Sequence, residues 1–106
     1  MGTKDYLYYL STDRQNRFRY FHDAQREQIV RFSIQYEALI DNEWTAIVRY
    51  DTAHGRPHKD ILHRNGNRER IEFQGYTREA VLNVGERDLK ANWHHYRATY
   101  LEEKDK

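Results

Sequence analysis

The sequence predicts an α+β domain: an antiparallel sheet of four to five strands with one long C-terminal helix packed on one face. Apolar and polar residues alternate through two neighbouring segments, 30–40 and 44–50, as they do in half-buried strands. From residue 77 onward, apolar residues instead recur at helical spacing, with charged residues between them. A sheet with one apolar face and a helix with one apolar stripe can bury each other in a two-layer sandwich.

The two alternating segments are expected to form a hairpin at the centre of the sheet. The apolar residues of the first segment are Val30, Phe32, Ile34, Tyr36, Ala38 and Ile40. Strand partners must share a face, so the loop length decides which residues pair. A three-residue loop pairs Ile40 with Trp44 and keeps the apolar set together, whereas a two-residue loop pairs Ile40 with Glu43 and mixes the faces. We therefore predict the three-residue loop.

Further strands are expected on both sides of this hairpin. Asn65-Gly66 is a strong turn signal and joins a strand at 59–64 to one at 68–74. Upstream, the aromatic segment 16–22 is predicted to pair with the central hairpin through the polar loop 23–28. Residues 1–15 are expected to form a packed arm or a short strand.

Thr77 is the predicted N-cap of the C-terminal helix. The inward stripe of this helix consists of Leu82, Leu89, Trp93, Tyr96 and Tyr100. Gly85 lowers helix stability by about 1 kcal/mol relative to Ala, and a close crossing over the sheet would explain its presence. We expect residues 103–106 to form a frayed tail.

Composition limits the classes of protein that the chain can represent. Residues 1–106 are predicted to form a single domain, because two independent cores need a longer chain. The absence of Cys excludes disulfides and thiolate chemistry, and no apolar run is long enough to span a bilayer. We therefore expect a cytoplasmic protein without a membrane partner. The formal net charge of +1 excludes a polycation that binds nucleic acid by bulk charge alone.

Most of the residues capable of chemistry lie between positions 49 and 63, in a segment that connects two predicted strands. This segment holds His54, His58 and His63, together with two Asp, two Arg and one Lys. Loops on a rigid sheet commonly carry binding and catalytic residues. The positions of Gly55 and Pro57 also favour a defined backbone path between the first two histidines.

The first chemical interpretation is metal-independent RNA cleavage. His54 and His58 would act as acid and base, since imidazole titrates near neutral pH, and Asp51 would orient one of them. The groups expected to contact phosphate are Arg49, Arg56 and Lys59, with Arg31 on the open face of the sheet.

Two other interpretations of the same segment remain open. A divalent metal could be held by His54, His58 and His63 with Asp51 or Asp60, although the spacing matches no established ligand signature. Alternatively, the side chains serve only to cap turns and pair with their neighbours. The preferred interpretation requires no metal and no cofactor.

The sequence resembles an uncharacterised family of short prokaryotic proteins. The residues that carry the resemblance are Val48-Arg-Tyr-Asp-Thr-Ala-His-Gly, His58-Lys-Asp-Ile-Leu-His and Asp88-Leu-Lys-Ala-Asn-Trp-His-His-Tyr-Arg. The family pattern reads approximately RYDTAHG, then HRDxLHPDG. A looser resemblance, through Tyr50, Asp51, Gly55 and His58, is to TumE-type toxins of toxin–antitoxin modules.

The resemblance to toxins implies an RNA-acting domain, and we expect a metal-independent endoribonuclease whose partners are RNA and a cognate antitoxin protein. The alternative is a non-catalytic module for protein interaction or oligomerisation, for which a homodimer is expected.

Overall fold

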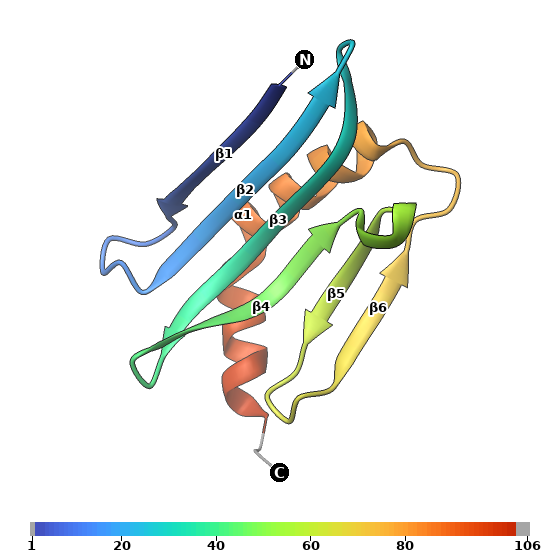
Figure 1. Cartoon of the computed structure of the whole chain (residues 1–106). Helices are drawn as coiled ribbons and strands as arrows, with labels where there is room; N and C mark the ends of the chain where they lie inside the picture. The colour runs from blue at the N-terminus through green and yellow to red at the C-terminus, as the bar shows by residue number, and fades with distance from the viewer. Residues whose placement is uncertain (1, 104–106) are drawn as a thin grey trace.

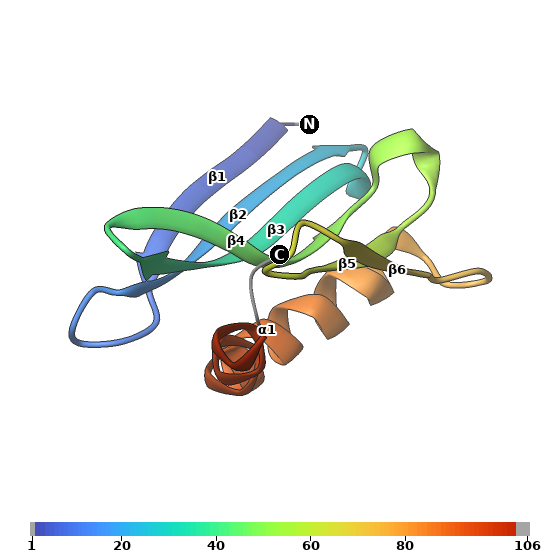
Figure 2. The same ribbon diagram turned by 90° about the horizontal axis from the view of Figure 1, so that it is seen from below.

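The computed structural model describes residues 2–103, with His54 described by its backbone alone. Within that range, six strands and one long helix follow one another: β1 (Gly2–Tyr9), β2 (Asn16–Gln25), β3 (Gln28–Ile40), β4 (Glu43–Asp51), β5 (His58–Leu62), β6 (Arg68–Glu72) and α1 (Arg78–Glu102). A 3-10 turn, η1 (Ala53–Gly55), precedes β5. The strands form one antiparallel sheet in chain order, and α1 crosses one face of it (Figures 1 and 2).

The predicted α+β architecture is therefore confirmed, with six strands in place of four to five. The additional strand is β1, so the N-terminal segment is an edge strand and not an arm. The ring of Tyr6 stacks on Tyr20 at 4.6 Å, and that of Tyr8 stacks on Phe18 at 5.3 Å. These cross-strand aromatic contacts hold β1 against β2.

The turn between β3 and β4 differs from the predicted three-residue loop. Asp41 and Asn42 both have positive φ, 52° and 65°, and form a two-residue turn that pairs Ile40 with Glu43. Such turns match the twist of the strands they join. The predicted three-residue loop is therefore wrong.

A bulge in β4 restores the predicted register beyond the turn. The register shifts after Tyr36, so that Tyr36 pairs with Val48 and Ile34 with Tyr50, as predicted. Ile47 is the additional residue, and its side chain is buried. The bulge thus reconciles a short turn with a continuous apolar face. The β2–β3 turn is also shorter than the predicted loop, with positive φ at Arg26 and Glu27.

The core lies between the sheet and α1. As predicted, five sheet residues that face the helix are buried: Phe32, Ile34, Tyr36, Val48 and Tyr50. Thr77 caps the helix by accepting a hydrogen bond from the Ala80 amide, also as predicted. Leu82 and Leu89 are buried, whereas Trp93 is only partly buried against the core.

Gly85 lies where α1 comes closest to the sheet. A Cβ atom at this position would lie 2.8 Å from Cγ of Tyr50 and 2.9 Å from Cδ1 of Ile34, which is too close for either side chain to remain in place. The absence of a side chain at Gly85 therefore allows the helix to lie directly on β3 and β4.

Gly85→Ala is expected to lower the free energy of unfolding by about 1–3 kcal/mol, because overpacking outweighs the gain in helix propensity. Urea denaturation measures the change, and Asn83→Ala at an exposed position of the same helix provides the control. A Gly85→Ala protein as stable as the wild type would show that the helix can move away from the sheet without loss.

Candidate functional site

The face of the sheet opposite α1 carries a continuous row of polar side chains. Arg31, Gln35 and Arg49 lie on this open face, as the alternation predicts. Several members of the row are paired: Glu37 is 7% exposed, accepts a hydrogen bond from Arg17 Nε at 2.5 Å, and also accepts one from Gln35. The row is therefore an ordered network and not a loose set of solvated charges.

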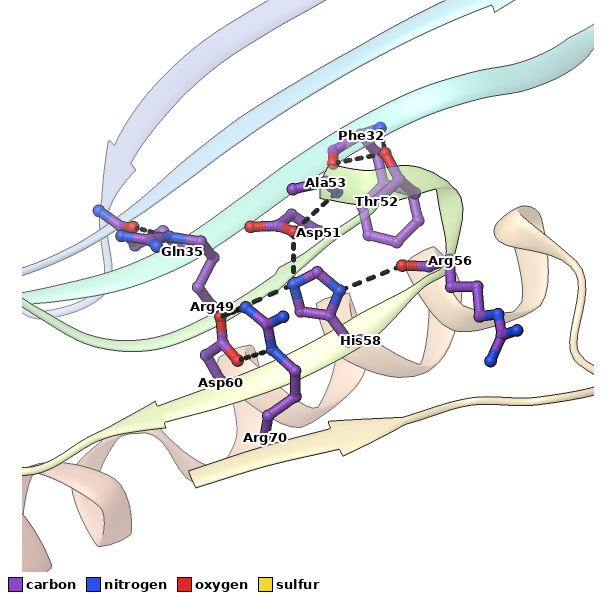
Figure 3. Close-up of polar contacts among 10 residues, drawn as sticks. All are labelled: Phe32, Gln35, Arg49, Asp51, Thr52, Ala53, Arg56, His58, Asp60 and Arg70. Carbon is purple, nitrogen blue, oxygen red and sulfur yellow. Dashed lines mark hydrogen bonds and ion pairs between the residues drawn. The ribbon is translucent and has the colours of Figure 1, made fainter. Parts of the chain in front are cut away.

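Three side chains of this row form a buried cluster, Asp51–His58–Asp60. The register of β4 and β5 creates it, because Asp51 pairs with His58 and Arg49 pairs with Asp60. Strand partners share a face, so all four side chains point away from the helix (Figure 3). His58 is 3% exposed and Asp60 is 1% exposed.

The imidazole of His58 is held on both sides. Its Nδ1 lies 3.1 Å from the carbonyl oxygen of Arg56. Its Nε2 lies 2.8 Å from Asp51 Oδ1 and 3.7 Å from Asp60 Oδ2. Asp51 Oδ1 in turn accepts a hydrogen bond from the Ala53 amide at 3.0 Å, which fixes the carboxylate at the start of η1.

Arg70 on β6 completes the cluster. Its Nε and Nη2 donate to the two oxygens of Asp60 at 2.9 and 3.2 Å. Burial by itself would raise the pKa of Asp60, but the hydrogen bonds and charge of Arg70 outweigh burial and hold that pKa below its usual value. Asp60 is therefore an ionised carboxylate beside the His58 ring.

The four residues predicted to contact phosphate lie on two different faces of the sheet. Arg49 donates to Gln35 Oε1 at 2.6 Å on the open face. Arg31 and Arg56 are 65% and 67% exposed and form loose ion pairs with Asp23 and Glu72. These three remain accessible from the open face or its rim.

Lys59, the fourth residue predicted to contact phosphate, lies on the opposite face of the sheet, away from the other three. Its Nζ donates to Tyr96 Oη at 2.7 Å and lies 3.3 Å from Asp88 Oδ2. Asp88 also accepts hydrogen bonds from the hydroxyls of Tyr50 and Tyr96, at 2.6 and 2.7 Å. Lys59 is therefore part of a polar contact that joins α1 to the sheet.

His63 does not lie with His58, so the structure does not bring together the histidines of the alternative metal site, His54, His58 and His63. Its Nδ1 lies 2.5 Å from Glu103 Oε2, and Glu103 also accepts a hydrogen bond from the Arg64 amide at 3.1 Å. Glu103, expected in a frayed tail, is thus attached to the β5–β6 loop. The rest of that tail, 104–106, lies outside the described residues, and so does the side chain of His54.

Sequence reasoning missed the contribution of Arg70. Arg70 was not among the site residues predicted from the sequence. The register of two hairpins, β4–β5 and β5–β6, brings Asp60 and Arg70 to the His58 ring. The Asn65-Gly66 turn was the available signal, because it fixes which residues of β5 and β6 are partners.

Lys59→Met is expected to lower the free energy of unfolding by about 1–3 kcal/mol, because it leaves the mostly buried Asp88 without its cation. Chemical denaturation measures the change. Lys90→Met is the control, because the Lys90–Glu86 pair is more exposed. A Lys59→Met protein as stable as the wild type would contradict this assignment.

The contact between His63 and Glu103 should make stability depend on pH. Hydrogen bonding to Glu103 raises the pKa of His63 above its ordinary value of 6.5. The stabilisation is therefore complete below pH 6.5 and is lost as the pH rises through the folded-state pKa. The difference in Tm between wild type and His63→Asn should shrink on the alkaline side. A difference independent of pH would contradict the ion pair.

Within residues 2–103, no helix has the length and apolar character needed to cross a membrane. Comparison with curated proteins and with solved structures gave no match. One family model matches residues 1–106 of the chain, its full length. The chain therefore belongs to the family described as domain of unknown function (DUF7718).

Proposed function

We propose that the protein is an RNA-acting, toxin-like domain that cleaves phosphodiester bonds on the open face of its sheet. The observation that carries this proposal is the buried His58 ring between two carboxylates, beside Arg70 and close to Arg49 (Figure 3). Imidazole, carboxylate and guanidinium groups are the components that phosphoryl chemistry uses for proton transfer and charge stabilisation. A toxin of this kind would act in the cytoplasm and be restrained by an antitoxin protein.

The arginines around the cluster supply the contacts that a phosphate backbone needs. Arg31 and Arg56 lie at the rim with most of their side chains exposed. Arg49 approaches from β4 and Arg70 from β6, on the two sides of the Asp60 carboxylate. Guanidinium groups bind phosphate oxygens bidentately. When an RNA strand lies across β4–β6, these arginines would therefore exchange their carboxylate partners for RNA phosphates.

In the metal-independent version, a base removes the proton of the RNA 2′-hydroxyl. The 2′-oxygen then bonds to phosphorus, and the bond to the 5′-oxygen breaks as that oxygen takes up a proton. His58, oriented by Asp51, would perform one transfer and His54 the other. Since His58 is 3% exposed, RNA would have to gain access to the ring before either transfer.

The alternative is a non-catalytic interaction or oligomerisation module. The observation that favours it is the pair of sheet edges: within the described residues, β1 and β6 each have one strand neighbour only. Leu7 and Tyr9 of β1 are also exposed, at 38% and 45%. An unpaired strand edge can add a strand from another chain, either a second copy or an antitoxin.

The test is cleavage of labelled total RNA by purified protein, with and without EDTA. His58→Gln should lower the cleavage rate about 100-fold or more, as loss of an acid–base group or of a group that anchors the reacting centre does. Arg49→Gln should also lower it, and Arg87→Gln, which removes an exposed arginine from the helix, should not.

No cleavage by the wild type, or equal cleavage by His58→Gln that retains its circular dichroism spectrum, would refute the endoribonuclease. Sedimentation of the wild-type protein then tests the alternative, which predicts a dimer.

A further inference from the structure

We infer that Asp51, His58 and Asp60 bind a divalent transition-metal ion, with Zn²⁺ or Mn²⁺ as the candidates. Each residue offers one ligand atom, and these three atoms all lie within 4.8 Å of one another (Figure 3). The inference rests on the geometry of the cluster. It depends on the proposed function only for the role that the ion would play.

The first observation is a buried ring nitrogen without a hydrogen bond. The Nδ1 of His58 faces the Arg56 carbonyl oxygen, which can only accept, so Nδ1 carries the hydrogen. Nε2 points into the cluster, and although Asp51 Oδ1 is 2.8 Å away, the approach is not aligned as a hydrogen bond. When the ring is neutral, the lone pair of Nε2 faces two negatively charged carboxylates and is repelled by them. A cation bound between the nitrogen and the carboxylates removes that repulsion.

The spacing of the three atoms suits a common ion. Zinc bonds of roughly 2.0–2.1 Å place two ligand atoms of a tetrahedral site about 3.3 Å apart. The distances from His58 Nε2 to Asp51 Oδ1 and Asp60 Oδ2 are 2.8 and 3.7 Å, on either side of that value. A single imidazole with two carboxylates is a donor set suited to Zn²⁺ or Mn²⁺.

The surroundings also resemble the outer shell of a metal site. Ligating histidines usually donate their second ring N–H to a carbonyl or carboxylate, as Nδ1 of His58 does to Arg56. Pro57 fixes one backbone angle between that carbonyl and the ring. The Ala53 amide holds Asp51, and Arg70 holds Asp60 through both oxygens, so each carboxylate has a fixed direction.

Three protein ligands leave a coordination position for a substrate oxygen. Under the proposed function, that position would take a phosphate oxygen of the RNA, next to Arg70. His58 Nε2 would then be a ligand and would not transfer a proton, so the ion and Arg70 would stabilise the charge on the phosphate in place of the metal-independent version.

The competing arrangement places a proton on Nε2, which makes an ion pair with Asp51 and leaves no room for a metal. Titration calorimetry separates the two. EDTA-treated, dialysed wild-type protein is titrated with Zn²⁺, Mn²⁺ and Mg²⁺, and we expect one Zn²⁺ or Mn²⁺ per chain with weaker Mg²⁺ binding, since Mg²⁺ prefers oxygen ligands.

The variants test whether the ion occupies this cluster. His58→Gln and Asp51→Asn should each weaken binding about tenfold or more, and His63→Asn, a histidine outside the cluster, should bind as the wild type does. Circular dichroism checks that each variant folds. Because two variants of the cluster are made, the test remains valid if one of them does not fold.

Failure of binding to the wild type, or unchanged binding to both cluster variants, would overturn the metal site. EDTA-resistant RNA cleavage without metal binding would reject this inference and keep the proposed function. Specific metal binding without RNA cleavage would support this inference and reject the proposed function.

Discussion

The close contact of α1 with the middle of the sheet determines the arrangement of the rest of the structure. At Gly85 the helix backbone lies against Ile34 and Tyr50, where any side chain would collide. This contact covers the inner faces of β3 and β4. Asp88, one turn further along, then accepts hydrogen bonds from Tyr50 and Tyr96 and faces Lys59. Apolar packing and a buried polar contact thus fix the same orientation.

The side chains on the two faces of β4 and β5 consequently have different surroundings. Lys59 and Tyr50 face the helix, and their neighbours Asp51, His58 and Asp60 face away from it. A sheet face without a covering layer would ordinarily leave these polar groups in water. Here His58 and Asp60 are nevertheless buried, because Arg70, Asp51 and the residues around η1 enclose them. Burial of His58 and Asp60 beside the half-buried Asp51 carries a desolvation cost, and this cost is the reason that the proposed function is assigned to the open face.

The sequence was sufficient to predict the elements of the fold where periodicity was strong. It was insufficient where the chain departs from that periodicity. The long β3 alternation, the Thr77 cap and the helical stripe predicted both layers and the residues between them. The two-residue turn at Asp41 and Asn42 was rejected because, without a register shift, it would mix the polar and apolar faces of the hairpin. The bulge at Ile47 was missed because it disturbs the alternation only once.

The face of the sheet on which Lys59 lies was not predicted, for a different reason. Ile61 and Leu62 are adjacent, so the pattern of β5 did not show which residues face the helix. Only the pairing of Tyr50 with Lys59 and of Asp51 with His58 resolves this ambiguity.

The order of the strands also affects how the chain folds during synthesis. Each strand of β1–β6 pairs with the next one along the chain, so the sheet can grow by successive hairpins with short loops to close. The helix follows all six strands in the chain, and Phe18, Ile34 and Tyr36 have no cover until it leaves the ribosome. A nascent chain that has completed its strands therefore presents a broad aromatic surface to other nascent chains and to chaperones. Translation of the 25 residues of α1, at about 5–20 residues per second, contributes to how many seconds that exposure lasts.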